Sequence, residues 1–177
     1  VLVIDDDDQI RHLLLDILKE RHRCAEASSA ESALIVLAQD RFDLVISDIN
    51  LGGMSGIELV PHVHSMSEDS IVLIVSGQNN IETAIEAMRA GAFDYIMKPF
   101  DVSQVEAAAE RALKQSLILK EKQRSKNQLE RLLIERTDEV NRLAHHDWVT
   151  GLNNHEIQYH ASTQSALERS LHNAIPN

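Results

Sequence analysis

Asp-Leu-Val-Ile-Ser-Asp, residues 43–48, is the stretch that decides how the rest of the sequence folds. Its apolar part, 44–46, is typical of a short buried strand, and the strand ends on the carboxylate of Asp48. The Gly-rich segment 49–56 follows at once and predicts a sharp loop. Open α/β sheets present reactive groups in this way, at the carboxyl end of a strand. Asp48 is therefore our first candidate for a reactive residue.

Four other short runs predict strands, and the segments between them show the spacing of amphipathic helices. All-apolar runs are typical of parallel strands buried on both faces, whereas the weaker run 24–27 predicts a strand near an edge. Strands that alternate with helices of about ten residues predict a doubly wound α/β domain with a five-stranded parallel sheet. The remaining predicted strands are 1–4, 71–75 and 95–97, and the predicted helices begin near residues 8, 28, 56, 81 and 101.

Residues at the expected helix ends carry capping signals. Asp7 or Asp8 is placed to cap the first helix, because aspartate accepts hydrogen bonds from the free amides of a first turn. Ser28 and Glu31 have the spacing of a capping box at the start of the second helix. Gly91 follows the fourth helix, where glycine readily adopts the left-handed conformation that ends many helices.

Length and composition indicate a soluble protein with one ordinary domain and an appendage. The 177 residues are 44% hydrophobic but only 3% aromatic, so the core must be built from aliphatic side chains. The formal net charge of -11 argues against non-specific binding to nucleic acid, which requires a basic face. No apolar run approaches the ~20 residues of a membrane span. The single cysteine, Cys24, fits a reducing compartment, so we expect a cytoplasmic protein without nucleic-acid or membrane partners.

Polar side chains follow four of the predicted strands, at the point where each strand ends. They are Asp5 and Asp6, then Asp48, then Ser76, then Lys98. Parallel strands end at one edge of a sheet, so these side chains are expected to lie together. Three crowded carboxylates repel one another, and hard oxygen ligands at this density favour Mg²⁺. Asp48 would then stay ionised as a nucleophile for phosphoryl transfer, and Lys98 and Ser76 are suited to hold the transferred group.

Weaker interpretations of the same residues stay open. The run Asp5 to Asp8 can be a solvated helix start, where negative charge is favourable. Ser76 can be an ordinary hydroxyl at a strand end. A cis peptide between Lys98 and Pro99 would make a tight turn and direct Lys98 back toward the edge of the sheet.

Four segments resemble the receiver domain of two-component response regulators, the CheY-like domains. They are 1–6, 48–56, 76–77 and 91–100, and they occur in the family's order over about residues 1–118. The resemblance implies the flavodoxin-like form of the doubly wound fold. It also implies that Asp48 accepts a phosphoryl group from a sensor histidine kinase or a phosphotransfer protein.

The resemblance further implies a Mg²⁺ site. Asp5 and Asp6 would hold the ion together with Asp48 and the backbone carbonyl of Asn50. This ion is the cofactor that we expect.

The resemblance gives roles to the remaining candidates, and two glycines depart from the family's pattern. Lys98 and Ser76 would grip the phosphoryl group, and Ser76 with Tyr95 would form a switch that reaches the face of the fourth helix, fifth strand and fifth helix. Gly52 stands where the family usually has proline, and Gly77 where it usually has alanine. Both changes loosen the loops over the site, so we expect altered switching or an altered phosphoryl lifetime.

The segment 100–150 contains neither glycine nor proline and predicts one long helix. Residues 119–146 are expected to form a coiled-coil linker, because apolar residues recur there at alternating three- and four-residue spacing. Such a linker would join two copies into a homodimer, together with the face named above. Charged residues at 122, 126 and 136 lie in the same seam, so a single solvated helix remains the alternative. The apolar seam residues are Leu119, Leu129, Leu133, Val140 and Leu143.

Residues 147–177 are expected to be the partial start of an output domain. Segment 143–154 resembles the entry to GGDEF diguanylate cyclase domains, and 165–177 looks like the helix that leads into an EAL phosphodiesterase domain. These resemblances imply an output concerned with cyclic-di-GMP turnover. Neither catalytic motif is present in the sequence, so this chain should neither make nor cleave a cyclic dinucleotide.

Together these features predict a response regulator that Asp48 phosphorylation controls and that signals through a helical linker. The alternative is a receiver-like docking or dimerisation module in which phosphorylation is incidental, and Mg²⁺-dependent phosphorylation of Asp48 discriminates the two. A phosphatase of the haloacid dehalogenase type also uses an aspartate and Mg²⁺. It needs a second aspartate two residues after the nucleophile, where Asn50 stands, so we set it aside.

Overall fold

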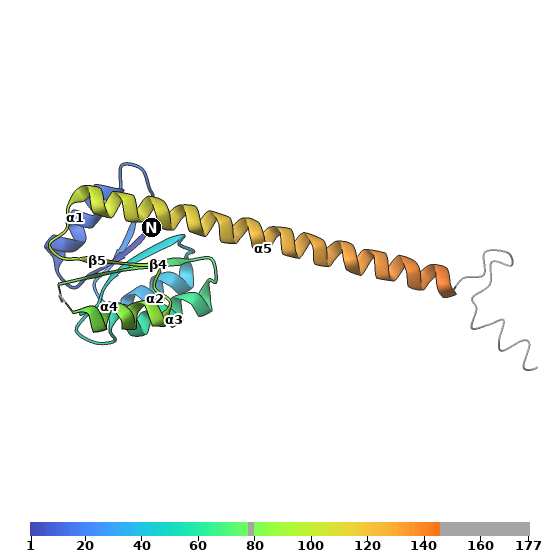
Figure 1. Cartoon of the computed structure of the whole chain (residues 1–177), viewed down its shortest axis with the longest axis horizontal. Helices are drawn as coiled ribbons and strands as arrows, with labels where there is room; N and C mark the ends of the chain where they lie inside the picture. Colours follow the sequence, from blue (N-terminus) through green and yellow to red (C-terminus); the bar gives the residue numbers. More distant parts are fainter. Residues whose placement is uncertain (78–79, 146–177) are drawn as a thin grey trace, which may run out of the picture. The chain divides into compact units, whose positions relative to one another are not determined.

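The computed structural model describes residues 1–77 and 80–145, and strands and helices alternate along this part of the chain (Figure 1). The predicted elements are confirmed, with ends that move by a few residues. The elements are β1 (Leu2–Ile4), α1 (Asp8–Leu18), β2 (Ala25–Ala27), α2 (Ala30–Gln39), β3 (Leu44–Asp48), α3 (Gly56–Met66), β4 (Ile71–Ser76), α4 (Ile81–Ala90), β5 (Asp94–Met97) and α5 (Val102–His145).

The five strands form one parallel sheet in the order β2-β1-β3-β4-β5. This is the doubly wound, flavodoxin-like topology that the sequence predicts, and β2 lies at an edge as expected. The strand β3 lies in the middle, and all five of its residues are buried. Asp48 pairs in register with Val75 of β4, so it reaches the carboxyl edge of the sheet between β1 and β4.

Helices cover both faces of the sheet and bury two aliphatic clusters (Figure 1). The helices α2, α3 and α4 lie on one face, where small side chains such as Ala33 and Ala87 let helix and sheet approach closely. On the other face α1 contributes Leu14 and Leu18. There α5 contributes Val105, Ala108, Ala109 and Ala112. Because both faces are covered, the strands can be apolar throughout.

The helix ends follow capping chemistry, with one correction to the sequence analysis. The side chain of Asp7 caps α1, and Gly91 ends α4 with φ +106°, both as predicted. The predicted capping box of Ser28 and Glu31 is wrong by one residue, because Ser29 caps α2 and pairs with Ser32. Two adjacent serines offer the same hydroxyl, and the sequence does not rank them. Glu31 is thereby released for another contact, described below.

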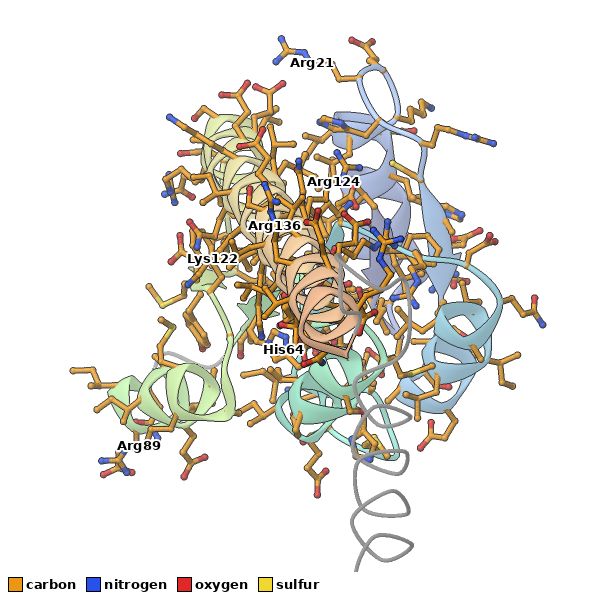
Figure 2. All side chains as sticks on the ribbon, turned by 90° about the vertical axis from the view of Figure 1, so that its right-hand side faces the viewer. Arg21, His64, Arg89, Lys122, Arg124 and Arg136 are labelled. Atoms are coloured by element: carbon orange, nitrogen blue, oxygen red, sulfur yellow. The ribbon has the colours of Figure 1, made fainter. Side chains whose placement is uncertain are left out.

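The helix α5 runs unbroken over 44 residues, as the absence of glycine and proline predicts. Internal contacts divide the chain into Val1–Gln123 and Arg124–Asn177. In the second unit, residues 124–142 are exposed, and Figure 2 shows charged side chains around α5, Arg124 and Arg136 among them. The predicted linker, 119–146, and the output fragment, 147–177, remain predictions, and residues 146–177 lie outside the described part. Within the described part, no helix is long and apolar enough to span a membrane.

Two polar contacts join α5 to the segments that precede β3 and β4. The Ser116 hydroxyl donates to the carbonyl oxygen of Asp69 at 2.8 Å, and Ser116 is buried. The Lys120 ammonium forms an ion pair with Asp43, the residue immediately before β3. The helix is thus held at the amino ends of the two strands whose carboxyl ends carry Ser76 and Asp48.

Candidate functional site

The carboxylate of Asp48 lies at the end of β3 with only 5% of the residue exposed. Its Oδ2 accepts a hydrogen bond from the backbone N–H of Asn50 at 2.6 Å, which closes the first turn of the loop. The next residue, Ile49, stays attached to the sheet through its N–H to the carbonyl of Val75, at 3.3 Å. Sheet and loop therefore fix the direction of this side chain.

The ammonium group of Lys98 lies between two carboxylates. Its Nζ is 2.7 Å from Oδ1 of Asp48 and 2.8 Å from Oδ2 of Asp5. The Lys98 backbone N–H donates to the carbonyl of Ser76 at 2.7 Å. The Lys98–Pro99 peptide is cis, so the turn that we predicted is confirmed. These contacts join residues from the ends of three strands. The two that are farthest apart in the sequence, Asp5 and Lys98, are separated by 93 positions.

Burial and pairing act on these charges in opposite directions. Burial raises the pKa of Asp48, and the hydrogen bond from Lys98 offsets part of that rise. Burial lowers the pKa of Lys98, but its hydrogen bonds to Asp48 and Asp5 outweigh this, so the net change is upward. Lys98 is therefore held in its charged form. Removing one partner of such a cluster would leave a buried charge without compensation.

Asp5 is fully buried, and both of its carboxylate oxygens have donors. The Oδ1 atom accepts from the backbone N–H of Asp7 at 3.0 Å, and Oδ2 accepts from Lys98. Asp6 is exposed at the same edge. Among residues 1–77 and 80–145, no three acidic, histidine or cysteine side chains already form a metal cage.

The donor set nevertheless fits Mg²⁺. Asp5 and Asp48 share one lysine, so two buried carboxylates face a single positive charge. Asp6 adds a third carboxylate that is open to solvent. Mg²⁺ favours such hard oxygen ligands and keeps several of its waters.

Ser76 and Tyr95 lie on neighbouring strands but in different surroundings. Ser76 ends β4 and is fully buried, and it pairs in register with Met97 of β5. Tyr95 is half-buried and packs against the aliphatic cluster on the face of α2, α3 and α4. The structure thus brings Ser76 to the edge that carries Asp48 and Lys98, and it puts the Tyr95 ring against the α4 side of the sheet.

The loop after Asp48 depends on its glycines. Gly52 has φ +72°, a left-handed conformation that proline cannot adopt. Gly56 starts α3 so close to β3 that an added Cβ would collide with the carbonyl oxygen of Asp48. At Gly77, in contrast, φ is not positive, and a Cβ added there would have no atom of the described residues within 4 Å. The loop conformation at position 52 therefore excludes the proline that the family usually has there, whereas alanine would fit at position 77.

Two side-chain contacts near the site are not predicted by the sequence. Glu31, at the start of α2, accepts a hydrogen bond from the backbone N–H of Met54 at 3.1 Å and so holds the loop after Asp48. That bond, with further local hydrogen bonds, lowers the pKa of Glu31. Arg11, in α1, is 8% exposed and binds the carbonyl oxygen of Asp5. The spacing of Arg11 with Leu14 and Leu18 was the available signal, because it places a charge on the buried face of the helix.

Comparison with known proteins agrees with this geometry. The family model of the response regulator receiver domain matches residues 1–110. The chain is 41% identical over 102 residues to the response regulator protein FleR of Pseudomonas aeruginosa, covering 57% of this chain and 22% of that protein. It is 33% identical over 114 residues to the DNA-binding transcriptional regulator NtrC of Azospirillum brasilense, covering 64% and 24%.

Solved structures give the same result. The crystal structure of the receiver domain of NtrX from Brucella abortus is 40% identical and superimposes with a TM-score of 0.61. That match covers 64% of this chain and 97% of the other. The chain spans about a quarter of the length of the curated relatives FleR and NtrC.

Proposed function

The chain belongs to the response regulator receiver family, and from that premise we propose that it is the phosphorylated part of a two-component response regulator, with Asp48 as the phosphoacceptor. One observation carries the proposal: Lys98 holds the carboxylates of Asp48 and Asp5 together at the carboxyl edge of the sheet. The donor is a sensor histidine kinase or a phosphotransfer protein. We place this reaction in the cytoplasm.

The proposed step is a phosphoryl transfer from a histidine nitrogen to Asp48. A carboxylate oxygen of Asp48 attacks phosphorus, the new P–O bond forms, and the P–N bond breaks with its electron pair going to the imidazole. Lys98 moves its hydrogen bond from Asp48 to an equatorial phosphoryl oxygen, where the negative charge of the transition state lies. The hydroxyl of Ser76 donates to a second oxygen.

Mg²⁺ is the proposed cofactor, held by Asp5, Asp6, Asp48 and the carbonyl of Asn50. When bound, it would neutralise the carboxylates and the phosphoryl oxygens. The acidic edge supports this assignment, because one lysine does not balance the buried carboxylates.

Phosphorylation is proposed to act through Ser76 and Tyr95. Movement of the Ser76 hydroxyl toward the phosphoryl group would free space at the end of β4, and Tyr95 would turn from one position to another on the α4 side. The packing of Tyr95 beside that face supports the proposal. The readout would be a change in the surface of α4, β5 and α5.

A homodimer is the proposed assembly. Apolar side chains recur on α4 at three- and four-residue spacing and are exposed, and Met97 of β5 is also exposed. A hollow of about 560 Å³ is lined by β5 and α5, Tyr95 included. Farther along α5, apolar seam residues are more than half exposed. The exposed members are Ile81, Ile85 and Met88 on α4, and Leu129, Leu133 and Val140 on α5.

The output domain is a separate proposal with two candidates. The resemblance of 143–154 and 165–177 favours an output concerned with cyclic-di-GMP turnover, and these segments lie almost wholly outside the described residues. The other candidate is a DNA-binding output, which the relative NtrC favours because it is named as a DNA-binding transcriptional regulator.

The test of the phosphoacceptor is a phosphate-affinity gel after incubation with a small-molecule phosphodonor and Mg²⁺. We expect a retarded band in the wild type that is lost without Mg²⁺ and in Asp48→Ala. Asp43→Asn, immediately before the same strand and away from the carboxyl edge of the sheet, is the matched control and should keep the band. If the wild type gives no retarded band, and if a further assay with a histidine kinase also shows no phosphorylation, the docking-module alternative is favoured.

A further inference from the structure

Arg11 is a charged residue on the buried face of α1. It lies at three- and four-residue spacing with Leu14 and Leu18, and only 8% of it is exposed. A buried guanidinium is costly unless acceptors bind its N–H groups. The acceptors that Arg11 binds therefore indicate why it is there.

The guanidinium of Arg11 donates three hydrogen bonds in three directions. Its Nε binds Glu26 of β2 at 2.8 Å, and Nη2 binds the carboxylate of Asp8 at 2.5 Å. Its Nη1 binds the backbone carbonyl of Asp5 at 2.9 Å. A planar guanidinium fixes its acceptors in direction as well as in distance. Arg11 thereby ties the acidic loop after β1 to β2.

These contacts divide the four consecutive aspartates into two pairs. The Asp7 side chain accepts hydrogen bonds from the first turn of α1, and Asp8 is bound to Arg11. Asp5 and Asp6 remain at the edge of the sheet. The Asp5 carboxylate accepts a hydrogen bond from Lys98, and the backbone carbonyl of Asp5 accepts one from Arg11. The sequence alone places Asp5 and Asp6 at the end of a strand but does not distinguish Asp7 from Asp8.

The geometry points to Arg11 as a positioning residue for the divalent cation, acting through the backbone of Asp5 and by holding Asp8 aside. This inference rests on the proposed Mg²⁺ site. Arg11 binds Asp5, Asp8 and Glu26, and these contacts set the direction of the loop. Arg11 has no proposed part in the phosphoryl transfer itself.

Two simpler roles for Arg11 predict different results. If its charge mattered alone, removing a cation beside an acidic site would strengthen Mg²⁺ binding. If it served only the stability of the fold, its removal would lower the melting temperature and leave the Mg²⁺ affinity of the folded protein unchanged. A positioning role predicts weaker binding.

The experiment is a calorimetric titration of the whole chain with Mg²⁺ and no phosphodonor. We compare the wild type with R11M, R11K and the control R21M. Arg21 is 65% exposed in its side chain, projects outward in Figure 2 and pairs with Glu110, away from the acidic loop. We expect R11M to raise the Kd about tenfold or more, as loss of a residue that orients a metal ligand commonly does. R21M should leave the Kd unchanged.

R11K keeps the charge but loses the planar arrangement of donors, so we expect its Kd for Mg²⁺ to rise severalfold. If R11M does not fold, R11K alone tests the positioning role. An unchanged or lower Kd in folded R11M, or an unchanged Kd in R11K, overturns the positioning role. A wild type that binds no Mg²⁺ would overturn the proposed metal site as well. Normal wild-type binding with an unaffected variant would remove only the role of Arg11.

Discussion

At the scale of single residues, Gly56 is the position in the loop after Asp48 that least tolerates a larger side chain. An added Cβ would collide with the Asp48 carbonyl oxygen and lie 2.8 Å from the Ser47 hydroxyl oxygen. Gly56→Ala should therefore lower the free energy of unfolding by about 1–3 kcal/mol, because overpacking forces strand and helix apart. Urea denaturation measures this cost.

The matched control is Gly77→Ala, at the end of β4. A Cβ added there meets no atom of the described residues within 4 Å, so alanine should be neutral or should stabilise the protein by about 0.4–1 kcal/mol by reducing the conformational freedom of the unfolded chain. Equal destabilisation by both changes would show that loss of glycine flexibility, rather than the close approach at Gly56, governs this edge of the sheet.

A second residue-scale prediction concerns Gly52, where the family usually has proline. Because φ is +72° here, Gly52→Pro should destabilise the protein by more than about 1 kcal/mol. Gly52→Asn should cost less, since asparagine tolerates the left-handed conformation. Thermal unfolding compares the two, and a proline variant as stable as the wild type would mean that the loop has a second conformation of similar energy.

At the scale of elements, the start of α3 provides a prediction about pH. Ser55 and Glu58 cap each other, with the Ser55 N–H bound to Glu58 at 2.9 Å and the Glu58 N–H bound to Ser55 at 3.1 Å. The hydrogen bonds from Ser55 lower the pKa of Glu58 in the folded protein. A lowered pKa means that the carboxylate stabilises the fold at neutral pH and that this contribution is lost as the pH falls below the ordinary glutamate value of about 4.3.

Ser55→Ala should lower the free energy of unfolding by about 1 kcal/mol at pH 7. Glu58→Ala should also destabilise the protein at pH 7, and its difference from the wild type should shrink toward acid. Glu82→Ala, in the first turn of α4, controls for the general effect of a negative charge at a helix start. A Glu58→Ala difference that stays constant between pH 7 and pH 3 would contradict the capping role.

At the scale of the whole molecule, substitutions in the exposed part of α5 should weaken the proposed dimer without changing the stability of residues 1–123. Leu129 and Leu133 lie in the proposed dimer seam, are 59% and 58% exposed, and belong to the unit that begins at Arg124. Replacing both with glutamate should raise the dimer Kd at least tenfold, equivalent to about 1.4 kcal/mol. The unfolding free energy of residues 1–123 should not change.

Sedimentation velocity measures this assembly over a range of concentrations. Leu132→Glu is the control, because Leu132 is 50% exposed but lies outside the alternating seam. A wild-type chain that stays monomeric at every concentration would favour the single solvated helix.

The fold was predictable from the sequence because each strand and helix has its own period of apolar residues. The edge position of β2, the N-cap of Asp7 and the end of α4 at Gly91 follow from local chemistry in the same way. The contacts of Glu31 and Arg11 were not predictable, because each depends on a partner from another element. Between equivalent neighbours, such as Ser28 and Ser29, only tertiary structure decides.

The candidate site shows the same division. Its members were predictable because parallel strands end at one edge, but the bridge from Lys98 to two carboxylates depends on the backbone after β5. The different contacts of Asp5 and Asp8 involve Arg11, which binds the backbone carbonyl of Asp5 and the carboxylate of Asp8. Sequence identifies the residues of this edge, and the structure distinguishes their surroundings.

The continuity of α5 has a consequence for the directions in which its side chains point. Buried alanines fix the first half of this helix, and Ser116 and Lys120 hold it at the amino ends of β3 and β4. In an α-helix each residue advances the chain by about 100° around the axis and 1.5 Å along it. Deleting one residue between 124 and 142 would turn the helical residues after the deletion by about 100° around the axis of α5, whereas deleting seven would leave the angle within about 20°. The number of residues in this segment is therefore a structural variable in its own right, because a deletion changes the helical phase of α5 while every residue around Asp48 stays intact.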